Sequence, residues 1–308
     1  MIRAGAAVRP LLDRGAPSWG PSARGRNADG AAYVAPAMLL IVSCLYLPSV
    51  YAFFYSLFDI RLLGTTHFVG LANYVFLGGD PELLAIIGRS AGFTACAVVL
   101  AIATALGVAL WIHTLGRFAA MLCQILVVVP WVISPIVGAL LFRWVFVNQI
   151  GLGLYALQRL GLRGFDPLSS PFSGMAVLIA FACWRTVGFA TILLLAGLKG
   201  IPKDFYEAAS VDGASALQKL WSITLPQLRT PMLITLVILT LSNLNTVEAP
   251  LVVTGGGPNL ATDILPLDLY QRAFAQYDFN SAVAMGVGMF AANIALALIY
   301  VRLVGRNA

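Results

Sequence analysis

Six long apolar runs constrain the fold of this chain more than any other feature of its sequence. A helix that crosses a lipid bilayer needs about 20 mostly apolar residues. We interpret six runs as such helices, at residues 33–58, about 88–112, about 118–146, 172–198, 231–253 and about 281–304. The sequence therefore predicts an all-α, polytopic membrane protein with about six transmembrane helices, in which residues 31–308 form the membrane domain.

The charge content excludes an ordinary soluble domain. Only 10% of the residues are charged and 60% are hydrophobic, whereas soluble domains carry about 25% charged residues. The formal net charge of +6 does not indicate a nucleic-acid partner, because the Lys and Arg residues gather in particular loops between the apolar runs. We therefore expect membrane lipid, and no nucleic acid, around this chain.

The same Lys and Arg residues predict the orientation of the chain, because loops that face the cytoplasm carry an excess of them. The excess falls in the N-terminal segment, after the second run, after the fourth run and at the C-terminus. We expect a multi-pass protein of the bacterial inner membrane with both termini in the cytoplasm. Residues 1–30 lack an apolar core, so we expect a disordered cytoplasmic tail there rather than a signal peptide.

The loop at residues 199–231 is long and patterned, unlike the other loops. Pro202 suits the first turn of a helix, and acidic residues such as Glu207 are favourable near a helix N-terminus. Gly213 is expected to end this helix, because glycine adopts a left-handed conformation at little cost. A second short helix is expected to follow, in which Trp221, Leu217 and Leu220 hold the loop against the membrane domain. We expect Pro226 and Pro231 to end that second helix.

The order of residues in this loop resembles the EAA loop of binding-protein-dependent ABC importer permeases. The matching residues are Glu207, Ala208, Ala209, Asp212, Gly213 and Ala214, followed by Leu225, Pro226 and Pro231. The resemblance implies the type I ABC importer permease fold. It also implies that the first six residues form a coupling helix, which sits in a cleft of a cytoplasmic ATPase subunit.

Further matches resemble the carbohydrate branch of that family, with the maltose-type first membrane subunit as its example. They include residues 68–74, the approach to the loop through Trp184 and Gly188, and the turn at residues 254–258. The pair Val247 and Glu248 departs from the branch, which more often has Phe-Asp there. The resemblance covers residues 32–306 and implies one half of the translocation path for a sugar, whether mono-, di- or oligosaccharide.

The resemblance also implies the partners of this chain. They are a second homologous permease, two copies of a cytoplasmic ABC ATPase and an extracytoplasmic solute-binding protein. The chain has no GxxxxGK[ST] sequence, which is the loop that holds nucleotide phosphates in many ATPases. We therefore expect a non-catalytic subunit that binds no cofactor, with ATP and Mg on the partner ATPase subunits.

Polar residues inside the apolar runs predict where the solute passes, because such residues are costly in lipid and usually face the interior of the helix bundle. The candidates are Asn243, Asn245, Thr246 and Glu248 in the fifth run, and Trp184, Arg185, Gly188 and Thr191 in the fourth. Amides and hydroxyls offer donors and acceptors that suit a neutral sugar or polyol. Arg185 and Glu248 are a candidate ion pair. Hydrogen bonding between helices, with no ligand, is the alternative role for each of these residues.

Two other classes of protein are weighed against an ABC importer permease. An ion-coupled secondary transporter needs membrane-embedded carboxylates, and only Glu248 fits that need. A membrane enzyme needs paired carboxylates or a metal cluster, which the sequence does not suggest. Within the importer class, a glycerophosphodiester or a polyol is the alternative to a sugar. A phosphate would favour several cations along the path, whereas the fourth and fifth runs offer Arg185 alone.

Overall fold

The computed structural model describes residues 33–60, 65–147, 151–161 and 166–305. The predicted N-terminal tail, residues 1–30, lies outside the described residues. The chain divides into two compact units, Met1–Ala52 and Phe53–Ala308. In the first unit, the described residues are helical and include the π-helical turn η1 (Val42–Tyr46) and most of α2 (Leu47–Tyr55). They belong to an apolar helix of 23 residues, Tyr33–Tyr55, which is long enough to span a bilayer.

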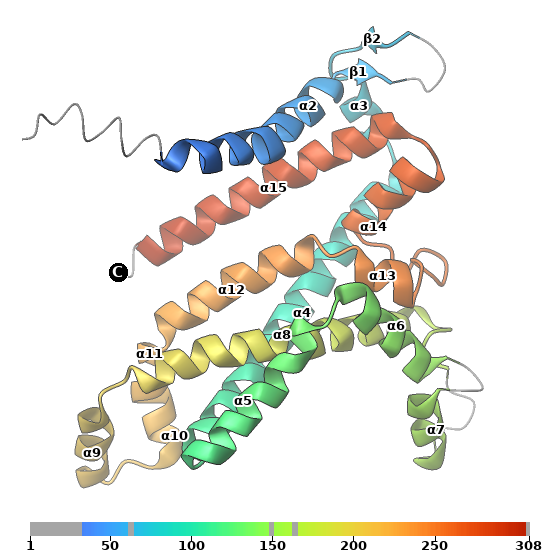
Figure 1. Cartoon of the computed structure of the whole chain (residues 1–308). Helices are drawn as coiled ribbons and strands as arrows, with labels where there is room; N and C mark the ends of the chain where they lie inside the picture. The colour runs from blue at the N-terminus through green and yellow to red at the C-terminus, as the bar shows by residue number, and fades with distance from the viewer. Residues whose placement is uncertain (1–32, 61–64, 148–150, 162–165, 306–308) are drawn as a thin grey trace, which may run out of the picture. The chain divides into compact units, whose positions relative to one another are not determined.

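The second unit contains three further long helices that could each cross a membrane, α4 (Pro81–Thr114), α8 (Pro171–Lys199) and α15 (Phe279–Gly305). Figure 1 shows their arrangement within this unit. Two bent pairs of helices supply the remaining candidates, so that the described residues hold four to six spans. The prediction of a helical membrane protein with about six spans is confirmed. The second run was predicted too short, because Asp80 caps α4 well before residue 88.

The third apolar run is not one helix, contrary to the prediction. It consists of α5 (Arg117–Val132) and α6 (Pro135–Phe146), which meet at 96°. Pro130 is tolerated inside α5. The break falls at Ile133 and Ser134, whose ψ angles of 139° and 133° are extended. Pro135 causes the break, since a proline disfavours helical geometry in the residue before it.

The fifth run is also divided. α12 (Arg229–Leu244) ends at Leu244, and the predicted continuation to Val253 is a separate helix, α13 (Glu248–Val253). Asn245 at the end of α12 has left helical geometry, with φ −107° and ψ 10°. At its other end, α12 meets the preceding helical stretch Ala216–Gln227 at 66°. The run is therefore shorter as a helix than hydrophobicity alone suggested.

Short elements complete the unit. They are the antiparallel strands β1 (Phe58–Asp59) and β2 (His67–Phe68), α3 (Ala72–Gly78), α7 (Leu152–Arg159), α14 (Leu265–Tyr270) and the π-helical turn η3 (Gln271–Ala275). The two strands are the departure from the all-α prediction among the described residues. Residues 68–74, which the sequence matched to the carbohydrate branch, join these elements, because the amide of Asn73 donates to the carbonyls of Ser56 and Phe58 at 2.8 and 2.9 Å.

The core of the second unit forms where α4 crosses α8. Ala101, Ala105 and Ala109 are fully buried on one face of α4 and pack against Ala190 and Leu194 of α8. Small residues spaced four apart allow helix backbones to approach closely in a membrane protein, where lipid gives no hydrophobic drive for association. This crossing fixes α8, which carries half of the predicted path residues.

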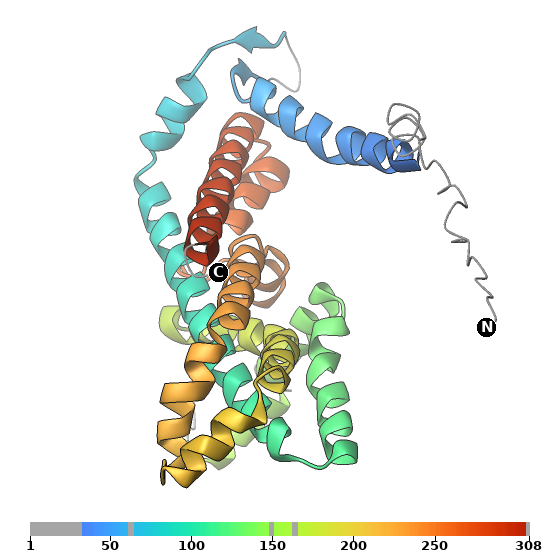
Figure 2. The same cartoon turned by 90° about the vertical axis from the view of Figure 1, so that its left-hand side faces the viewer.

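The predicted cytoplasmic loops lie at one end of the second unit. The loop at residues 199–231, which includes α9 (Lys203–Val211) and α10 (Ala216–Lys219), lies at the same end as the connection between α4 and α5, whereas the strands and α3 lie at the opposite end (Figures 1 and 2). The loops that carry excess Lys and Arg thus share one side of the bundle, as the orientation rule requires.

Candidate functional site

The predicted coupling helix is present as α9. Pro202 stands at its N-cap, and the helix ends at Asp212. Gly213 has φ +75°, the left-handed conformation that was predicted for it. Its geometry allows the amide of Ala214 to donate to the carbonyl of Ala209 at 2.9 Å, which satisfies an end group of the helix. The Asp-Gly pair therefore turns the chain sharply and leaves α9 as a short projecting helix.

The six residues of the EAA match lie together on α9 and the turn that follows it. Glu207, Ala208, Asp212 and Gly213 are exposed. Ala209 and Ala214 are partly buried. The exposed residues form a small surface with little side-chain bulk and two carboxylates, which a groove on another protein could accept.

Hydrogen bonds hold α9 to the segment that returns to the membrane. The hydroxyls of Tyr206 and Thr224 are 3.0 Å apart, and the ammonium of Lys219 donates to the hydroxyl of Ser210 at 2.7 Å. Thr224 is buried at the end of the π-helical turn η2 (Leu220–Thr224). Tyr206 also packs against the α4–α8 core, next to the fully buried Leu228. The base of the loop is therefore joined to the bundle.

Two expectations about this base were wrong. Trp221 and Leu217 are 65% and 63% exposed and do not hold the loop against the bundle, whereas Leu220 is partly buried. Tyr206 is the aromatic residue that packs against the core there. Pro226 and Pro231 do not end a helix, because Pro226 lies at the start of α11 (Leu225–Gln227) and Pro231 lies in the first turn of α12, where proline is tolerated. The capping box of Ser215 and Gln218, which starts α10, was missed although its spacing is readable in the sequence.

A small polar cavity brings together three of the predicted path residues. Its polar lining comes from Arg185 and Thr186 of α8, from Ser242 and Asn243 of α12, and from Thr246 at the break before α13. Phe181, Ala182 and Ala249 complete the wall. Its volume of about 10 Å³ suffices for about one water molecule. The break between α12 and α13 puts Thr246 beside α8, so the divided fifth run creates this cavity.

Hydrogen bonds around the cavity leave Arg185 without a partner at one atom. The amide of Asn243 donates to the carbonyl of Leu239 at 2.9 Å, and the hydroxyl of Thr186 donates to the carbonyl of Ala182 at 2.7 Å. The Nε of Arg185 is buried and has no hydrogen-bond partner among the residues that the structure describes. The buried Nε shows that part of this cation is held away from water.

Glu248 does not pair with Arg185, contrary to the predicted ion pair. Its Oε2 accepts from the hydroxyl of Thr246 at 3.3 Å and from the amide of Val247 at 3.2 Å. The carboxylate thus satisfies groups at the start of its own helix, where the helix dipole favours a negative charge.

The other predicted path residues do not line this cavity. Asn245 exchanges two hydrogen bonds of 3.0 Å with Asn293 of α15, which is the helix-to-helix role that was the alternative for these residues. Thr191 is fully buried and donates to the carbonyl of Val187 at 2.7 Å. Trp184 packs in an aromatic cluster with Phe142 and Phe181.

Gly188 lies where α8 touches the backbone of α5. A Cβ atom at this position would stand 2.0 Å from the carbonyl oxygen of Val127 and 3.0 Å from the Cα of Val128. No larger residue fits at this crossing without moving a helix, since such distances are far inside van der Waals contact. The structure therefore gives Gly188 a packing role at the crossing of α8 with α5.

A cluster of charges lies at the opposite end of the unit, and no sequence pattern predicts that its members meet. Arg272 forms ion pairs with Asp80 and with Asp268, the second at 2.8 Å. The Nε of Arg89 donates to the backbone carbonyl of Asp263 at 3.0 Å. Burial, and then the charge of Asp268, raise the pKa of the Asp263 carboxyl to about 6. The hydrogen bond from Arg272 lowers the pKa of Asp80. These contacts tie the start of α4 to α14.

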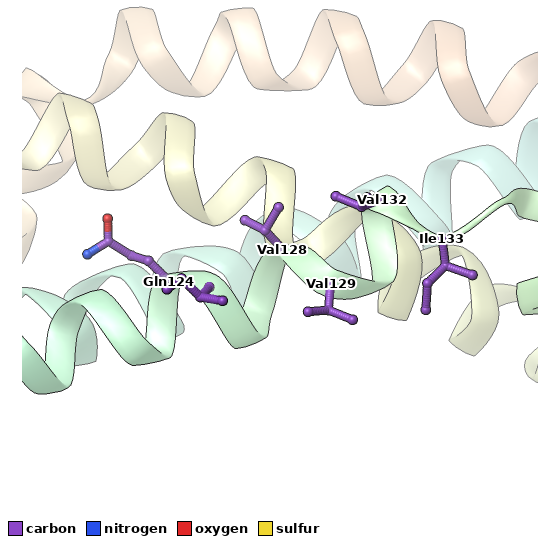
Figure 3. Close-up of a pocket in the computed structure, with 6 residues that line it drawn as sticks. Gln124, Val128, Val129, Val132 and Ile133 are labelled. Atoms are coloured by element: carbon purple, nitrogen blue, oxygen red, sulfur yellow. The ribbon is translucent and has the colours of Figure 1, made fainter.

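An apolar groove runs along α5 (Figure 3). It has a volume of about 530 Å³ and is lined by Gln124, Ile125, Val128, Val129, Val132 and Ile133. Ile125 and Val132 are 57% and 71% exposed. Gln124 lies at one end of the groove in the figure, and its amide donates to the carbonyl of Ala120 at 2.9 Å. The groove is a surface that lipid or another apolar helix can cover.

Comparison with known proteins gives a consistent family. Residues 97–307 match the family described as "Binding-protein-dependent transport system inner membrane component". The sulfoquinovosyl glycerol transport system permease protein SmoG of Agrobacterium fabrum is 29% identical over 88% of each chain. The trehalose/maltose transport system permease protein MalF of Thermococcus litoralis is 30% identical over 90% of this chain and 93% of its own. The sn-glycerol-3-phosphate transport system permease protein UgpA of Agrobacterium fabrum is 30% identical over 89% of this chain and 94% of its own.

Solved structures agree on the fold. A chain in the crystal structure of a bacterial ABC transporter involved in the import of the acidic polysaccharide alginate superposes with a TM-score of 0.79. It is 21% identical, and the match covers 92% of this chain and 96% of that chain. The arrangement of helices in this chain is therefore that of an importer permease.

Proposed function

This chain belongs to the family of binding-protein-dependent transport system inner membrane components, and we propose that it forms half of the path through which an ATP-driven importer moves a sugar across the bacterial inner membrane. It is a non-catalytic subunit. The observation that carries the proposal is the projecting helix α9 and the turn after it. Glu207 of the helix and Gly213 of the turn stand exposed at the end of the bundle where Lys and Arg are in excess.

The exposed surface of α9 is the proposed contact with a cytoplasmic ATPase. Two copies of that ATPase would bind ATP and Mg, and would close and reopen as ATP is bound and hydrolysed. The small residues Ala208 and Ala209 allow the helix to enter a groove, and Glu207 offers a charge to its rim. Hydrogen bonds at the base of the loop support this role, because a lever must transmit force to the spans rather than bend.

The proposed solute is a sugar or a related polyol derivative. Three relatives carry names that record sulfoquinovosyl glycerol, trehalose and maltose, and sn-glycerol-3-phosphate. The proposed path passes between α8 and α12 at the polar cavity. A cavity with room for one water cannot hold a sugar, so this conformation is a closed one, and transport requires the two helices to separate there.

Two further partners complete the proposal. A second homologous permease would supply the other half of the path and would cover the apolar groove on α5, whose exposed apolar side chains and bent continuation into α6 present a long face along the bundle. An extracytoplasmic solute-binding protein would deliver the solute at the opposite end from α9. Both termini would then lie in the cytoplasm.

Replacement of Asn243 tests the path. Asn243→Leu removes a buried amide from the cavity wall at similar volume, so ATP-driven uptake of the solute should fall, by about tenfold or more, because the lost groups leave polar partners unsatisfied. Thr191→Val, at a buried hydroxyl that does not line the cavity, is the matched control and should keep most uptake. Uptake in liposomes that hold the full complex is the measurement. Equal uptake by both variants and the wild type would remove the cavity from the path.

A further inference from the structure

The guanidinium of Arg185 stands out among the polar groups of the spans. It lies within α8, and its Nε is buried at a cavity without a hydrogen-bond partner among the described residues. An arginine stays charged at any physiological pH. A charge inside a membrane span is costly and is found paired, or facing a water-filled space, or at a functional site. Arg185 therefore requires an explanation that the fold alone does not supply.

The carboxylates of the described residues do not neutralise Arg185. No ion pair joins it to any carboxylate in the described part of the chain, and the ion pairs of Arg89 and Arg272 lie at the outer end of α4 and around α14 and η3. Glu248 is the nearest acidic residue along the chain to the cavity wall, and its carboxylate is bound to groups of its own helix. Among the described residues of this chain, the cation is thus held without a counter-charge.

The groups around Arg185 suit a polar ligand better than a structural carboxylate. Ser242, Thr246 and Asn243 bring hydroxyls and an amide to the same cavity, and these groups both donate to and accept from sugar hydroxyls. Trp184 and Phe181 place aromatic rings on the adjoining part of α8. A guanidinium binds a carboxylate or a phosphate through two parallel hydrogen bonds, which its unpartnered Nε–H is available to make.

We propose that Arg185 selects a solute that carries one anionic group, a carboxylate or a phosphate, on a sugar or polyol. The inference rests on the proposed function of this chain as an importer permease for carbohydrates. It replaces the neutral sugar that the amides and hydroxyls alone suggested. It also accounts for a single cation in the path, because one guanidinium matches one anionic group. The names of the relatives record both uncharged disaccharides and a glycerol phosphate, so the family does not decide the charge.

The test uses the intact complex, with both permeases, the ATPase and the solute-binding protein, reconstituted in liposomes. The probes are matched pairs that differ in charge: glucose and glucuronate, galactose and galacturonate, and glycerol and glycerol 3-phosphate. ATP-driven uptake of each is measured for the wild type, Arg185→Gln, Arg185→Lys and the control Arg302→Gln, which removes an exposed cation at the far end of α15. The carboxylate pairs and the phosphate pair show which anion is taken.

We expect the wild type to take up the charged member of a pair. Arg185→Gln should lower that uptake by about tenfold or more, since it removes one partner of a buried charge pair. Arg185→Lys keeps the charge but loses the planar fork, and it should raise the KM of uptake with kcat largely retained. Arg302→Gln should match the wild type. If the complex with Arg185→Gln fails to assemble, the KM of uptake by Arg185→Lys decides whether Arg185 selects the solute.

Three outcomes overturn the inference. The first is uptake of the neutral member of a pair that stays normal in Arg185→Gln, which would overturn the selection of an anion but keep the proposed function of the chain. The second outcome is that Arg185→Lys takes up the charged member with an unchanged KM, while Arg185→Gln either keeps normal uptake or fails to assemble. Arg185 would then not select the solute, and a failure to assemble would assign it a structural role. Failure of the wild type to take up any probe would count against the carbohydrate assignment as well, and so against both proposals.

Discussion

At the scale of the residue, glycine and aspartate set the most local constraints in this chain. Gly188 lets α8 rest on the backbone of α5, with no space for a Cβ atom beside the carbonyl of Val127. Asp263 is almost completely buried beside Asp268 and keeps a carboxylate oxygen without a hydrogen-bond partner among the described residues. Each feature costs stability that the surrounding contacts must offset, and each leads to a measurable prediction.

Gly188→Ala should destabilise the protein although alanine is the better helix former. The added methyl group collides with the backbone of α5 rather than with a mobile side chain, and such overpacking costs about 1–3 kcal/mol. Gly107→Ala in α4 is the control, because no atom lies within 4 Å of its added Cβ, and it should be neutral or stabilising. Thermal unfolding of the purified complex in detergent distinguishes the two. A Gly188→Ala protein as stable as the wild type would refute the close crossing.

Asp263→Asn should stabilise the protein at pH 7.5 and by about half as much at pH 5. The pKa of Asp263 is raised to about 6 in the folded protein, above about 3.9 in an unfolded chain. The ionised carboxylate therefore opposes folding above pH 6, by up to about 3 kcal/mol. As the pH falls below 6 the folded protein takes up a proton, and this penalty shrinks until it disappears below about 3.9, where the unfolded chain is protonated as well. The measurement is the melting temperature of both proteins at the two pH values.

Asp80→Asn supplies the control of opposite sign. The hydrogen bond from Arg272 lowers the pKa of Asp80 in the folded state, so its carboxylate stabilises the fold above the unfolded pKa and loses that effect as the pH falls through the folded pKa. The substitution should lower the melting temperature at pH 7.5. If Asp263→Asn and Asp80→Asn shifted it in the same direction, the assigned charges of this cluster would be wrong.

At the scale of the element, the loop from α9 to α11 behaves as one braced unit. The Tyr206–Thr224 contact joins the first helix of the loop to the π-helical turn η2, and the Lys219–Ser210 contact joins it to α10. A π-helical turn often marks a functional site within a helix. The bracing predicts that force applied to α9 reaches α12 through this segment.

Breaking the brace should reduce coupling rather than assembly. Tyr206→Phe and Thr224→Val each remove one hydroxyl of the pair, worth about 1 kcal/mol. We expect fewer solutes carried per ATP hydrolysed in either variant. The double variant should be no worse than the single ones, because both remove the same hydrogen bond. Additive losses in the double variant would show that the two hydroxyls act independently. Trp221→Phe, at an exposed ring, is the control.

Gly213→Pro should uncouple ATP hydrolysis from uptake. Gly213 has φ +75°, and proline fixes φ near −65°, so the turn that presents α9 cannot form. Gly213→Ala strains the same turn more mildly and should give a smaller loss. Normal uptake in Gly213→Pro, measured together with ATP hydrolysis, would show that this turn is not needed.

The sequence predicted elements where a local cause decides the structure, and it failed where a tertiary contact does. The φ of Gly213 and the start of α9 after Pro202 follow from residue type alone. The bend before Pro135 also has a local cause in the proline itself, but the residues on both sides of it are apolar, so hydrophobicity alone suggested one span. The exposure of Trp221 depends on which residues of the loop pack on the bundle, for which no local pattern exists. The partners of Glu248 are its sequence neighbours Thr246 and Val247, which meet its carboxylate because the break after α12 puts Glu248 at the start of a new helix. Of the eight predicted path residues, only Arg185, Asn243 and Thr246 line the cavity, because the break after α12 decides which residues meet α8.

At the scale of the whole second unit, the loop at residues 199–231 and the cavity are linked by the same two helices. α8 leads from the cavity into the loop, and α12 leads from the loop back to the cavity. The side chains of Leu228 and Pro231 close on Gly197 where the two helices meet beneath the cavity. Movement of α9 would therefore open or close the cavity by changing the separation of α8 and α12.

The groove on α5 gives a prediction about assembly. Val132→Cys and Ile125→Cys place thiols at exposed positions of the groove. We expect both to form disulfide cross-links with cysteines introduced into the second permease when the complex is oxidised. Leu152→Cys, on the exposed face of α7 away from the groove, is the control and should not cross-link to the same partner. Cross-linking from α7 alone would move the interface.

The central claim is that a cytoplasmic ATPase drives transport through this chain, and ATP-driven uptake in sealed vesicles tests it most directly. Vesicles are prepared with the permease pair, with the binding protein outside, and with or without the cytoplasmic ATPase inside. Uptake is followed with ATP enclosed in the vesicles or with a proton or sodium gradient imposed. We predict uptake only with the ATPase and ATP, and its loss in Glu207→Arg. Uptake that a gradient drives in the absence of the ATPase would contradict the account.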